Sequence, residues 1–405
     1  MAPPGAASSR RAAADMTALL VQPRAMRWFW QWSPPPLGLL SMAAAAPGTR
    51  VIDCAQSGQE EADVIADHRP DIVGVTAFTS TRHEALAVLE AAKAAGARTV
   101  LGGPHVSARN IAEQVAQHYP FVDHVIRGDG ERAWARLVAG ESLPRVSLEY
   151  LPDLDALPVP AWGQVPVMEY APRDSGIYQG VDLETTPRIS IVVSRGCPGR
   201  CAFCRAWKRP MRRHSAAWVR RALEPLADMG VRHICIDDDC WATDAANALE
   251  ICDVLSDLGF VWQATTRADL ITPELVEYMT ASGCWQVAVG LESGSRHVLD
   301  LIGKRLDLDA VLSARRACWD AGLRFVALTM TGYPGETAED RREHAAFMAR
   351  LDADDTGTLG VTVILPGTQL YSEAVAAGQV SDDIWLGPGR HLIATPEGPR
   401  MWSEA

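Results

Sequence analysis

Cys197, Cys201 and Cys204 stand close together in the segment SRGCPGRCAFC, which spans residues 194–204. Three thiolates with this CxxxCxxC spacing can bind three irons of a four-iron, four-sulfur cluster and leave the fourth iron open to a further ligand. The alternatives are a zinc knuckle or a group of buried thiols. Zinc sites usually combine two short pairs of ligands into a set of four, whereas this sequence has a single triplet. The spacing therefore favours an iron–sulfur cluster.

The triplet resembles the signature of the radical S-adenosylmethionine (SAM) superfamily. The resemblance implies that the open iron binds the amino and carboxylate groups of SAM. It also implies that an electron from the cluster cleaves SAM to a 5′-deoxyadenosyl radical, and that Phe203 lies near the adenine. The strand-like stretch 189–193 precedes the triplet directly, so the cluster is expected at the carboxyl end of a strand, where barrel enzymes hold their active sites.

Further polar residues follow other predicted strands, and the resemblance gives them roles around SAM. Asp238, in a run of three aspartates, is expected to contact the ammonium group, with a solvated helix N-cap as the alternative. Arg267 suits the SAM carboxylate because a guanidinium pairs bidentately with a carboxylate; a surface salt bridge is the alternative. Glu292 and Ser293 are expected to meet the ribose or the amino group, unless they only form a turn. No residue is singled out as a catalytic acid or base.

Strand–helix alternation organises the chain around these residues. The second half predicts six strands, at 189–194, 233–237, 261–265, 286–291, 324–331 and 360–364. Six such units fit a partial (β/α)6 TIM-like barrel, which is the core that the resemblance implies. The first half predicts strands at 17–21, 49–53, 71–76, 98–103 and 124–127, with a helix at 82–96. Continuous apolar strands alternating with helices indicate a Rossmann-like, doubly wound parallel sheet.

Ligands bind such sheets at the carboxyl ends of the strands, and these ends are rich in glycine and hydroxyl groups. The order of these glycine- and hydroxyl-rich segments, ahead of the cysteine triplet, resembles the order in the cobalamin-binding group of radical SAM enzymes. The residues implied to hold cobalamin are Pro36, Leu37, Gly38, Thr76, Thr79, Ser80, Gly102, Gly103, His105, Gly128, Gly130 and Glu131. The Asp-x-His-x-x-Gly motif that supplies an axial histidine is absent. Cobalamin would therefore bind without that ligand, or the domain is an empty scaffold.

The predicted organisation has five parts: a disordered extension (1–15), a cobalamin-binding-type domain (16–140), a proline-containing linker (141–185), the barrel (186–370) and a short C-terminal tail (371–405). Trp28, Trp30 and Trp32 alternate just before a proline run. They would roof a cofactor cavity or pack a loop onto the barrel.

Composition limits the function classes. A net charge of −12 argues against binding to nucleic acid, which needs a cationic face, and no apolar stretch is long enough to span a membrane. Nine cysteines without a secretion signal predict a reducing cytoplasm. The six cysteines outside the triplet are interpreted mostly as core thiols.

The sequence thus predicts an enzyme with a [4Fe-4S] cluster, SAM and cobalamin. The leading hypothesis is methylation of an unactivated carbon in a small metabolite, in natural-product (antibiotic) biosynthesis. An electron donor such as flavodoxin or ferredoxin, or a partner reductase, would supply its electrons. The short C-terminal tail keeps a rival open, a cobalamin-free radical SAM dehydratase or lyase of the aminoglycoside type with the N-terminal domain as scaffold. A second rival is a non-catalytic cofactor-binding module.

Overall fold

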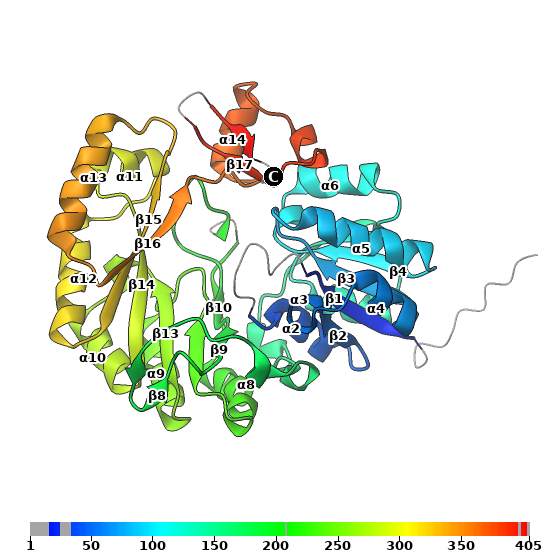
Figure 1. Cartoon of the computed structure of the whole chain (residues 1–405), viewed down its shortest axis with the longest axis horizontal. Helices are drawn as coiled ribbons and strands as arrows, with labels where there is room; N and C mark the ends of the chain where they lie inside the picture. The colour runs from blue at the N-terminus through cyan, green and yellow to red at the C-terminus, as the bar shows by residue number, and fades with distance from the viewer. Residues whose placement is uncertain (1–15, 25–33, 207–208, 396–397, 403–405) are drawn as a thin grey trace, which may run out of the picture.

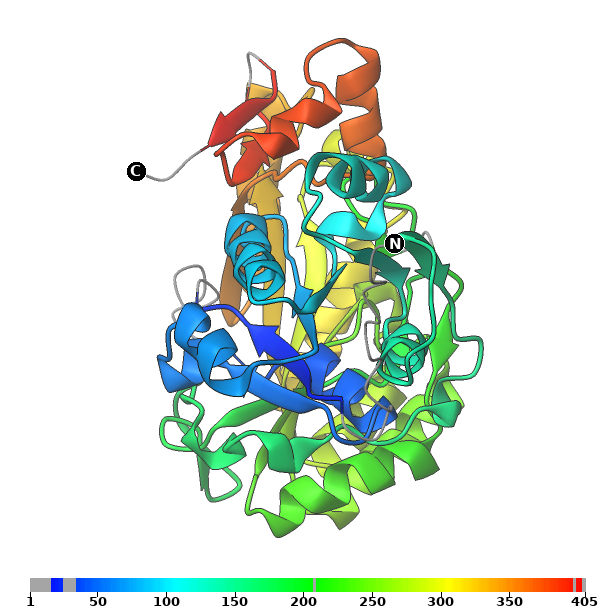
Figure 2. The same cartoon turned by 90° about the vertical axis from the view of Figure 1, so that its right-hand side faces the viewer.

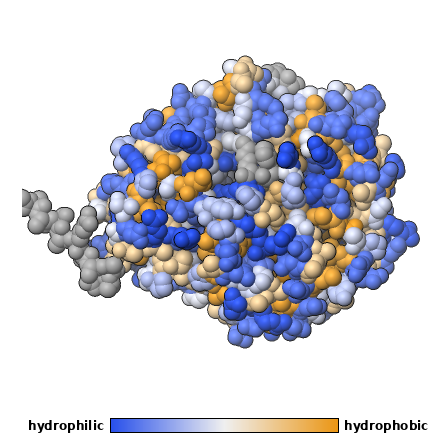
Figure 3. Space-filling view, turned by 180° about the vertical axis from the view of Figure 1, so that it is seen from behind, coloured by the Kyte–Doolittle hydropathy of each residue, from blue (hydrophilic) through white to orange (hydrophobic). Residues whose placement is uncertain are grey.

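The computed structural model describes the chain except residues 1–15, 25–33, 207–208, 396–397 and 403–405. The expected disordered extension and the alternating tryptophans 28, 30 and 32 lie outside the described residues. Two α/β domains stand side by side, and the last part of the chain bridges them at one end (Figures 1 and 2). Hydrophilic and hydrophobic residues are interspersed on the face seen in Figure 3.

The N-terminal domain is a six-stranded sheet in the order β2-β1-β3-β4-β5-β6, and every neighbouring pair is parallel. Its strands are β1 (Ala18–Gln22), β2 (Arg50–Asp53), β3 (Ile72–Thr76), β4 (Arg98–Gly102), β5 (His124–Gly128) and β6 (Val146–Glu149). Its helices are α2 (Leu37–Ala45), α3 (Cys54–Ser57), α4 (Glu61–His68), α5 (Arg82–Ala94), α6 (Arg109–His118) and α7 (Glu131–Val138). The central strands are buried on both faces, as parallel strands between helices must be. The expected doubly wound sheet is confirmed.

The predicted linker differs from the structure at its start. Residues 146–149 form β6 and belong to the sheet, so the boundary expected at residue 140 cuts off an edge strand. The rest of the segment packs firmly: the Trp162 indole donates to the carbonyl of Ala222 at 2.9 Å, and the Tyr170 hydroxyl donates to Asp53 at 2.8 Å. The short hairpin of β7 (Ile177–Tyr178) and β8 (Val181–Asp182) follows.

The second domain is an open barrel of six parallel strands in the order β16-β15-β14-β13-β12-β9. These are β9 (Arg188–Ile191), β12 (His233–Ile236), β13 (Val261–Thr266), β14 (Cys284–Glu292), β15 (Arg324–Thr331) and β16 (Asp355–Val361). Helices α8 (Ala216–Asp228), α9 (Ala245–Asp257), α10 (Pro273–Ala281), α11 (Arg296–Ile302), α12 (Leu308–Asp320) and α13 (Ala338–Leu351) cover the outside (Figure 1). The partial (β/α)6 barrel is confirmed, although its sixth strand starts at residue 355, earlier than the expected 360.

The C-terminal segment joins the two domains. It contains α14 (Gln369–Ala376) and the hairpin of β17 (His391–Ile393) and β18 (Arg400–Trp402). Arg82 of the N-terminal domain is fully buried and donates to the carbonyls of Trp385 and Gly387, each at 3.0 Å. Arg390 pairs with Glu84 in return. Because the same segment also bonds to the barrel side, through Ile393 with Val363 and the amide of Leu370 with the carbonyl of Ala202, it contacts both domains.

Candidate functional site

The cysteine loop leaves the barrel just beyond β9. The strand pair β10 (Ser194–Arg195) and β11 (Arg212–Arg213) closes the base of the loop. The sulfurs of Cys197 and Cys201 lie 3.4 and 4.0 Å from the point that a Cβ on Gly199 would occupy. Backbone amides donate to two of the sulfurs, from Gly199 to Cys197 and from Ala206 to Cys204, both at 3.4 Å. Cys197 and Cys201 thus border a common space that a side chain at residue 199 would fill.

These thiols suit a multinuclear cluster better than one metal ion. The sulfurs around a single tetrahedral zinc are only about 3.8 Å apart, since each Zn–S bond is about 2.3 Å long. Among the described residues no three His, Cys, Asp or Glu side chains are gathered tightly enough to hold one ion. An iron–sulfur cube needs wider spacing, and the donor set of three thiols with N–H···S hydrogen bonds fits it.

A fourth cysteine adjoins the triplet, and sequence reasoning placed it in the core. The buried thiol of Cys240, just after β12, lies beside Cys197. The Cys240 thiol and the amide of Gly199 lower the pKa of Cys197, whereas burial raises the pKa of Cys201 to about 11. Cys197 is therefore the thiol most ready to serve as a thiolate ligand.

Two of the three aspartates after β12, Asp238 and Asp239, lie beside the cysteine loop in different environments. Asp238 is buried, and its carboxylate accepts from the amides of Val193 and Ser194 at 2.7 and 3.0 Å and from the Ser194 hydroxyl. It holds the start of the cysteine loop and has little capacity left for SAM. Asp239 is exposed and accepts from the amide of Gly196 at 3.2 Å. Of the two, Asp239 is the better placed to meet a cation beside the cysteines.

Arg267 reaches the cysteine loop. One guanidinium nitrogen lies 3.5 Å from the Cβ position of Gly199. The guanidinium also binds Asp269 through two bonds of 2.8 Å and the carbonyl of Arg305 at 3.2 Å. A SAM carboxylate would therefore compete with Asp269 for this side chain. Phe203 is half-buried and packs against the hydrophobic cluster that contains Cys201 and Tyr333.

Glu292 ends β14 in a strained backbone conformation, with φ at +65°. Its carboxylate pairs with Lys304 at 2.8 Å, and both side chains are buried. The second carboxylate oxygen, Oε2, has no hydrogen-bond partner among the described residues, so it is available to a ligand. Ser293 is also buried and accepts from the amide of Ser295 at 3.1 Å. Sequence reasoning missed Lys304, because nothing in the pattern after residue 292 marks it as buried.

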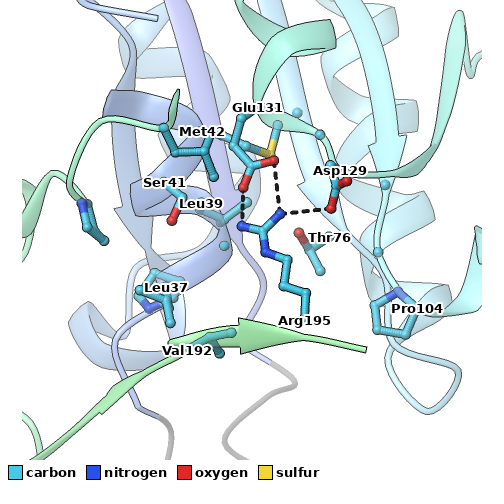
Figure 4. A pocket seen from close by; sticks show the side chains of 18 of the residues that line it. Leu37, Leu39, Ser41, Met42, Thr76, Pro104, Asp129, Glu131, Val192 and Arg195 are labelled. Carbon is cyan, nitrogen blue, oxygen red and sulfur yellow. Dashed lines mark hydrogen bonds and ion pairs between the residues drawn. The ribbon is translucent and has the colours of Figure 1, made fainter. Parts of the chain in front are cut away.

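A cavity of about 490 Å³ separates the two domains (Figure 4). The carboxyl ends of β3, β4 and β5 and the start of α2 form one wall, and the barrel contributes Ser190, Val192 and Arg195 to the other. Most of the lining is apolar, from residues such as Leu37 and Met42. A mostly apolar pocket with a few convergent polar groups is typical of a cofactor site.

Nine of the twelve residues expected to bind cobalamin line this cavity: Pro36, Leu37, Gly38, Thr76, Gly102, Gly103, Gly128, Gly130 and Glu131. Thr79, Ser80 and His105 are not among its lining residues. His105 is buried against the Trp385 ring, and the carbonyls of Thr79 and Ser80 accept from Arg82 and Arg390. Ser80 and His105 therefore contact the C-terminal segment, and Thr79 binds Arg82, which itself donates to that segment.

The glycines of the cavity wall have two different functions. Gly103 and Gly128 have φ near +100° and +94°, and a Cβ on Gly128 would fall 2.0 Å from the carbonyl of Glu149. Glycine is required at these two positions because of the positive φ and the neighbouring backbone, whether or not a ligand binds. Gly38 has nothing within 4 Å of its Cβ position, and Gly102 only a carbonyl at 3.8 Å. Only these two leave open space for a ligand.

A buried ionic network crosses the cavity wall and links the domains. Arg195, two residues before Cys197, donates to Asp129 at 2.8 Å and to Glu131 at 2.6 Å (Figure 4). Arg212 binds the other oxygen of Asp129 at 2.7 Å. Burial opposes ionisation, but the bonds from Arg212 and Arg195 and the amide of Leu151 leave the pKa of Asp129 below its usual value. The network connects the β5–α7 loop to the base of the cysteine loop.

Comparison with known proteins agrees with this geometry. Residues 191–348 match the Radical SAM superfamily, and residues 33–138 match the B12 binding domain. The chain therefore carries a B12-binding domain followed by a Radical SAM domain. Its cofactors are accordingly a [4Fe-4S] cluster, SAM and cobalamin, and the residues around the cysteine loop and the cavity fit these groups.

Similar proteins match three quarters or more of this chain. The uncharacterized methyltransferase PH0819 of Pyrococcus horikoshii is 28% identical over 375 residues, covering 84% of this chain and 79% of its own length. The anaerobic magnesium-protoporphyrin IX monomethyl ester cyclase of Rubrivivax gelatinosus is 28% identical over 327 residues, covering 75% of this chain and 58% of its own length. The structure of the radical SAM methyltransferase TsrM from Kitasatospora setae superposes with a TM-score of 0.72 at 19% identity, covering 89% of this chain and 75% of that one. The likeness to TsrM shows the fold.

Proposed function

We propose that this chain is a cobalamin-dependent radical SAM enzyme that methylates an unactivated carbon of a small metabolite, in natural-product biosynthesis. The observation that carries the proposal is the shared cavity. The strand ends of the B12-binding domain form one wall, and residues directly before the cysteine loop form the other. Cobalamin held in this cavity would face the SAM site across the space left for a substrate.

When bound, SAM at the cluster supplies a carbon radical and cobalamin supplies a transferable methyl group. The chain's own residues bind, orient and shield. Cys197, Cys201 and Cys204 hold the cluster, and Asp239 takes the role that the sequence assigned to Asp238, binding the SAM ammonium group. Arg267 binds the SAM carboxylate.

Glu292 and Ser293 complete the SAM site beside Lys304. The apolar lining of the cavity, with Leu37, Leu39 and Val192, limits the water that reaches the reacting carbon. Exclusion of water matters because a primary carbon radical abstracts hydrogen from unintended donors.

The test is anaerobic reconstitution with iron, sulfide and hydroxocobalamin, followed by reduction in the presence of SAM. We expect an iron–sulfur absorption band, a cobalamin spectrum that stays with the protein, and both 5′-deoxyadenosine and S-adenosylhomocysteine in the presence of substrate. Protein that retains no cobalamin, or that forms no S-adenosylhomocysteine with any candidate substrate, would contradict the methyltransferase assignment.

A radical SAM lyase or other non-methylating reaction is the second candidate. The cyclase relative favours it, since its name denotes a reaction other than methyl transfer. The same experiment separates the two, because 5′-deoxyadenosine without S-adenosylhomocysteine indicates the second candidate.

We further propose a cytoplasmic enzyme that receives electrons from flavodoxin, ferredoxin or a dedicated reductase. All nine cysteines are free thiols, as a reducing compartment permits. Within the described part of the chain, no helix is long and apolar enough to cross a membrane.

A further inference from the structure

We propose that Asp237 binds a protonated nitrogen of the substrate, so that the substrate is an amine or a guanidine. The inference rests on the proposed function and names the substrate class for the same cavity. Asp237 lies just after the end of β12, on the inner side of the barrel.

The barrel floor is a layer of polar side chains that satisfy one another. Strand register places Ser190, Cys235, Gln263 and Gln286 side by side on β9, β12, β13 and β14. Gln286 donates to Gln263 at 2.7 Å, and Gln263 donates to Asp174 at 3.0 Å. Ser190, Cys235 and Gln263 are each at most 6% exposed. This layer closes the lower end of the barrel to a ligand.

Asp237 stands one step above this floor and faces open space. Alternation along a strand puts it on the same side as Cys235, and it lines the cavity between the domains together with Ser190. Unlike Ser190 and Cys235 below it, Asp237 is exposed. The Ser190 hydroxyl and the Cys235 thiol, the latter at 3.1 Å, donate to its two oxygens. A carboxylate offers about four acceptor positions, so about two remain.

The other acidic groups of the cavity are already neutralised. Asp129 and Glu131 pair with Arg195 and Arg212. Asp237 instead accepts from two neutral donors, the Ser190 hydroxyl and the Cys235 thiol. Arg173 is the nearby cation: burial lowers its pKa, and Asp237 is one of the groups that oppose this. Asp237 is therefore the carboxylate that the cavity presents to an incoming ligand.

The position of Asp237 also suits a substrate. It lies two residues before Asp239, whose carboxylate holds the amide of Gly196 in the cysteine loop. A substrate nitrogen at Asp237 would thus place the rest of the molecule in the cavity between the cysteine loop and the B12-binding domain. Charge-assisted hydrogen bonds from an ammonium or guanidinium are stronger and more directional than neutral ones.

The test uses the reconstituted holoenzyme with cobalamin and SAM bound. Three probes of similar size, benzylamine, benzyl alcohol and benzoate, are titrated at pH 7 by ligand-observed NMR. We expect benzylamine to bind at least about tenfold more tightly than benzyl alcohol, the low end for a charged hydrogen bond, and benzoate to bind most weakly. The preference should fall below twofold in Asp237→Asn and persist in Asp237→Glu.

Asp257→Asn is the matched control, because Asp257 lies on the outer surface of α9 and pairs with Arg220. It should keep the wild-type preference. The inference is overturned if the wild type shows no preference for the amine, or if Asp237→Asn retains it. It is also overturned if Asp237→Asn weakens SAM binding tenfold without any probe, since Asp237 would then belong to the SAM site. Failure of the proposed function would appear separately, as wild-type protein that binds no cobalamin or does not cleave SAM.

Discussion

Replacing Arg195 with methionine should loosen the contact between the two domains. The methionine keeps most of the aliphatic volume and removes the guanidinium. Glu131, whose side chain is 5% exposed, then loses its bonds of 2.6 and 3.5 Å to Arg195. Removing one partner of a buried ion pair costs about 3–5 kcal/mol. Asp129 keeps its bonds to Arg212 at 2.7 Å and to the amide of Leu151 at 2.8 Å. Its contribution to the loss of stability is therefore small.

We therefore expect the free energy of unfolding to fall by about 3–4 kcal/mol, at the lower end of that range because Arg195 is itself 23% exposed. The assay is anaerobic unfolding of the cluster-free protein in urea, monitored through its tryptophan fluorescence. The cobalamin dissociation constant, measured in parallel, should rise at least tenfold, since the β5–α7 loop lines the cavity.

A double-variant cycle decides whether the buried charge is the cause. Glu131→Gln in the Arg195→Met background removes the unpaired carboxylate and should restore about 2 kcal/mol. Arg220→Met, which breaks an exposed pair with Asp257, should cost less than about 1 kcal/mol. The reasoning is refuted if Arg195→Met unfolds within 1 kcal/mol of the wild type, or if Glu131→Gln restores nothing.

Three further predictions follow from single sites. Cys201→Ala should abolish 5′-deoxyadenosine formation while the protein stays folded by circular dichroism; undiminished product in a chromatographic assay would contradict the cluster assignment. Gly128→Ala should lower the free energy of unfolding by more than about 2 kcal/mol, because its Cβ would meet a carbonyl of β6 at 2.0 Å. Gly38→Ala, with nothing within 4 Å of its Cβ, is the matched control. Gly38 lies in α2, where alanine is the better helix former, so urea melts should show no loss of stability and a gain of at most about 1 kcal/mol. Burial lowers the pKa of His214 to about 4, so the unfolded chain takes up a proton at a higher pH than the folded chain does. The free energy of unfolding should therefore fall between pH 6.5 and pH 4, and His214→Gln should reduce that loss by up to about 3 kcal/mol. An unchanged pH profile of the free energy of unfolding would show that His214 is not responsible.

The strand pattern was readable because parallel strands buried on both faces are continuous apolar runs. β3 and β15 occur where their runs of valine and leucine predicted them. β6 was missed because it is an edge strand, in which Leu148 is 65% exposed. An edge strand carries no buried run to mark it, and the sheet forms it through backbone hydrogen bonds to β5.

The sequence did not show which of the residues expected to bind cobalamin would line the cavity. Thr76 and His105 both follow strands whose carboxyl ends reach the same edge of the sheet. Thr76 lines the cavity, whereas His105 packs against Trp385, more than 250 positions further along the chain. Which way a loop turns after its strand depends on the segment packed against it, and that segment is not local in sequence.

The sequence by itself determined the cluster, because three thiols within eight residues need only a short loop to share one inorganic core. It also determined the two α/β domains, because hydrophobic periodicity is a local property. Only the tertiary structure separated Asp237 from Asp238, because Asp238 is bound by the cysteine loop, which lies more than 40 residues earlier in the chain, whereas Asp237 faces the cavity between the domains. Only the tertiary structure, likewise, joined Arg195 to Asp129 and Glu131, because that contact exists only when the two domains pack together.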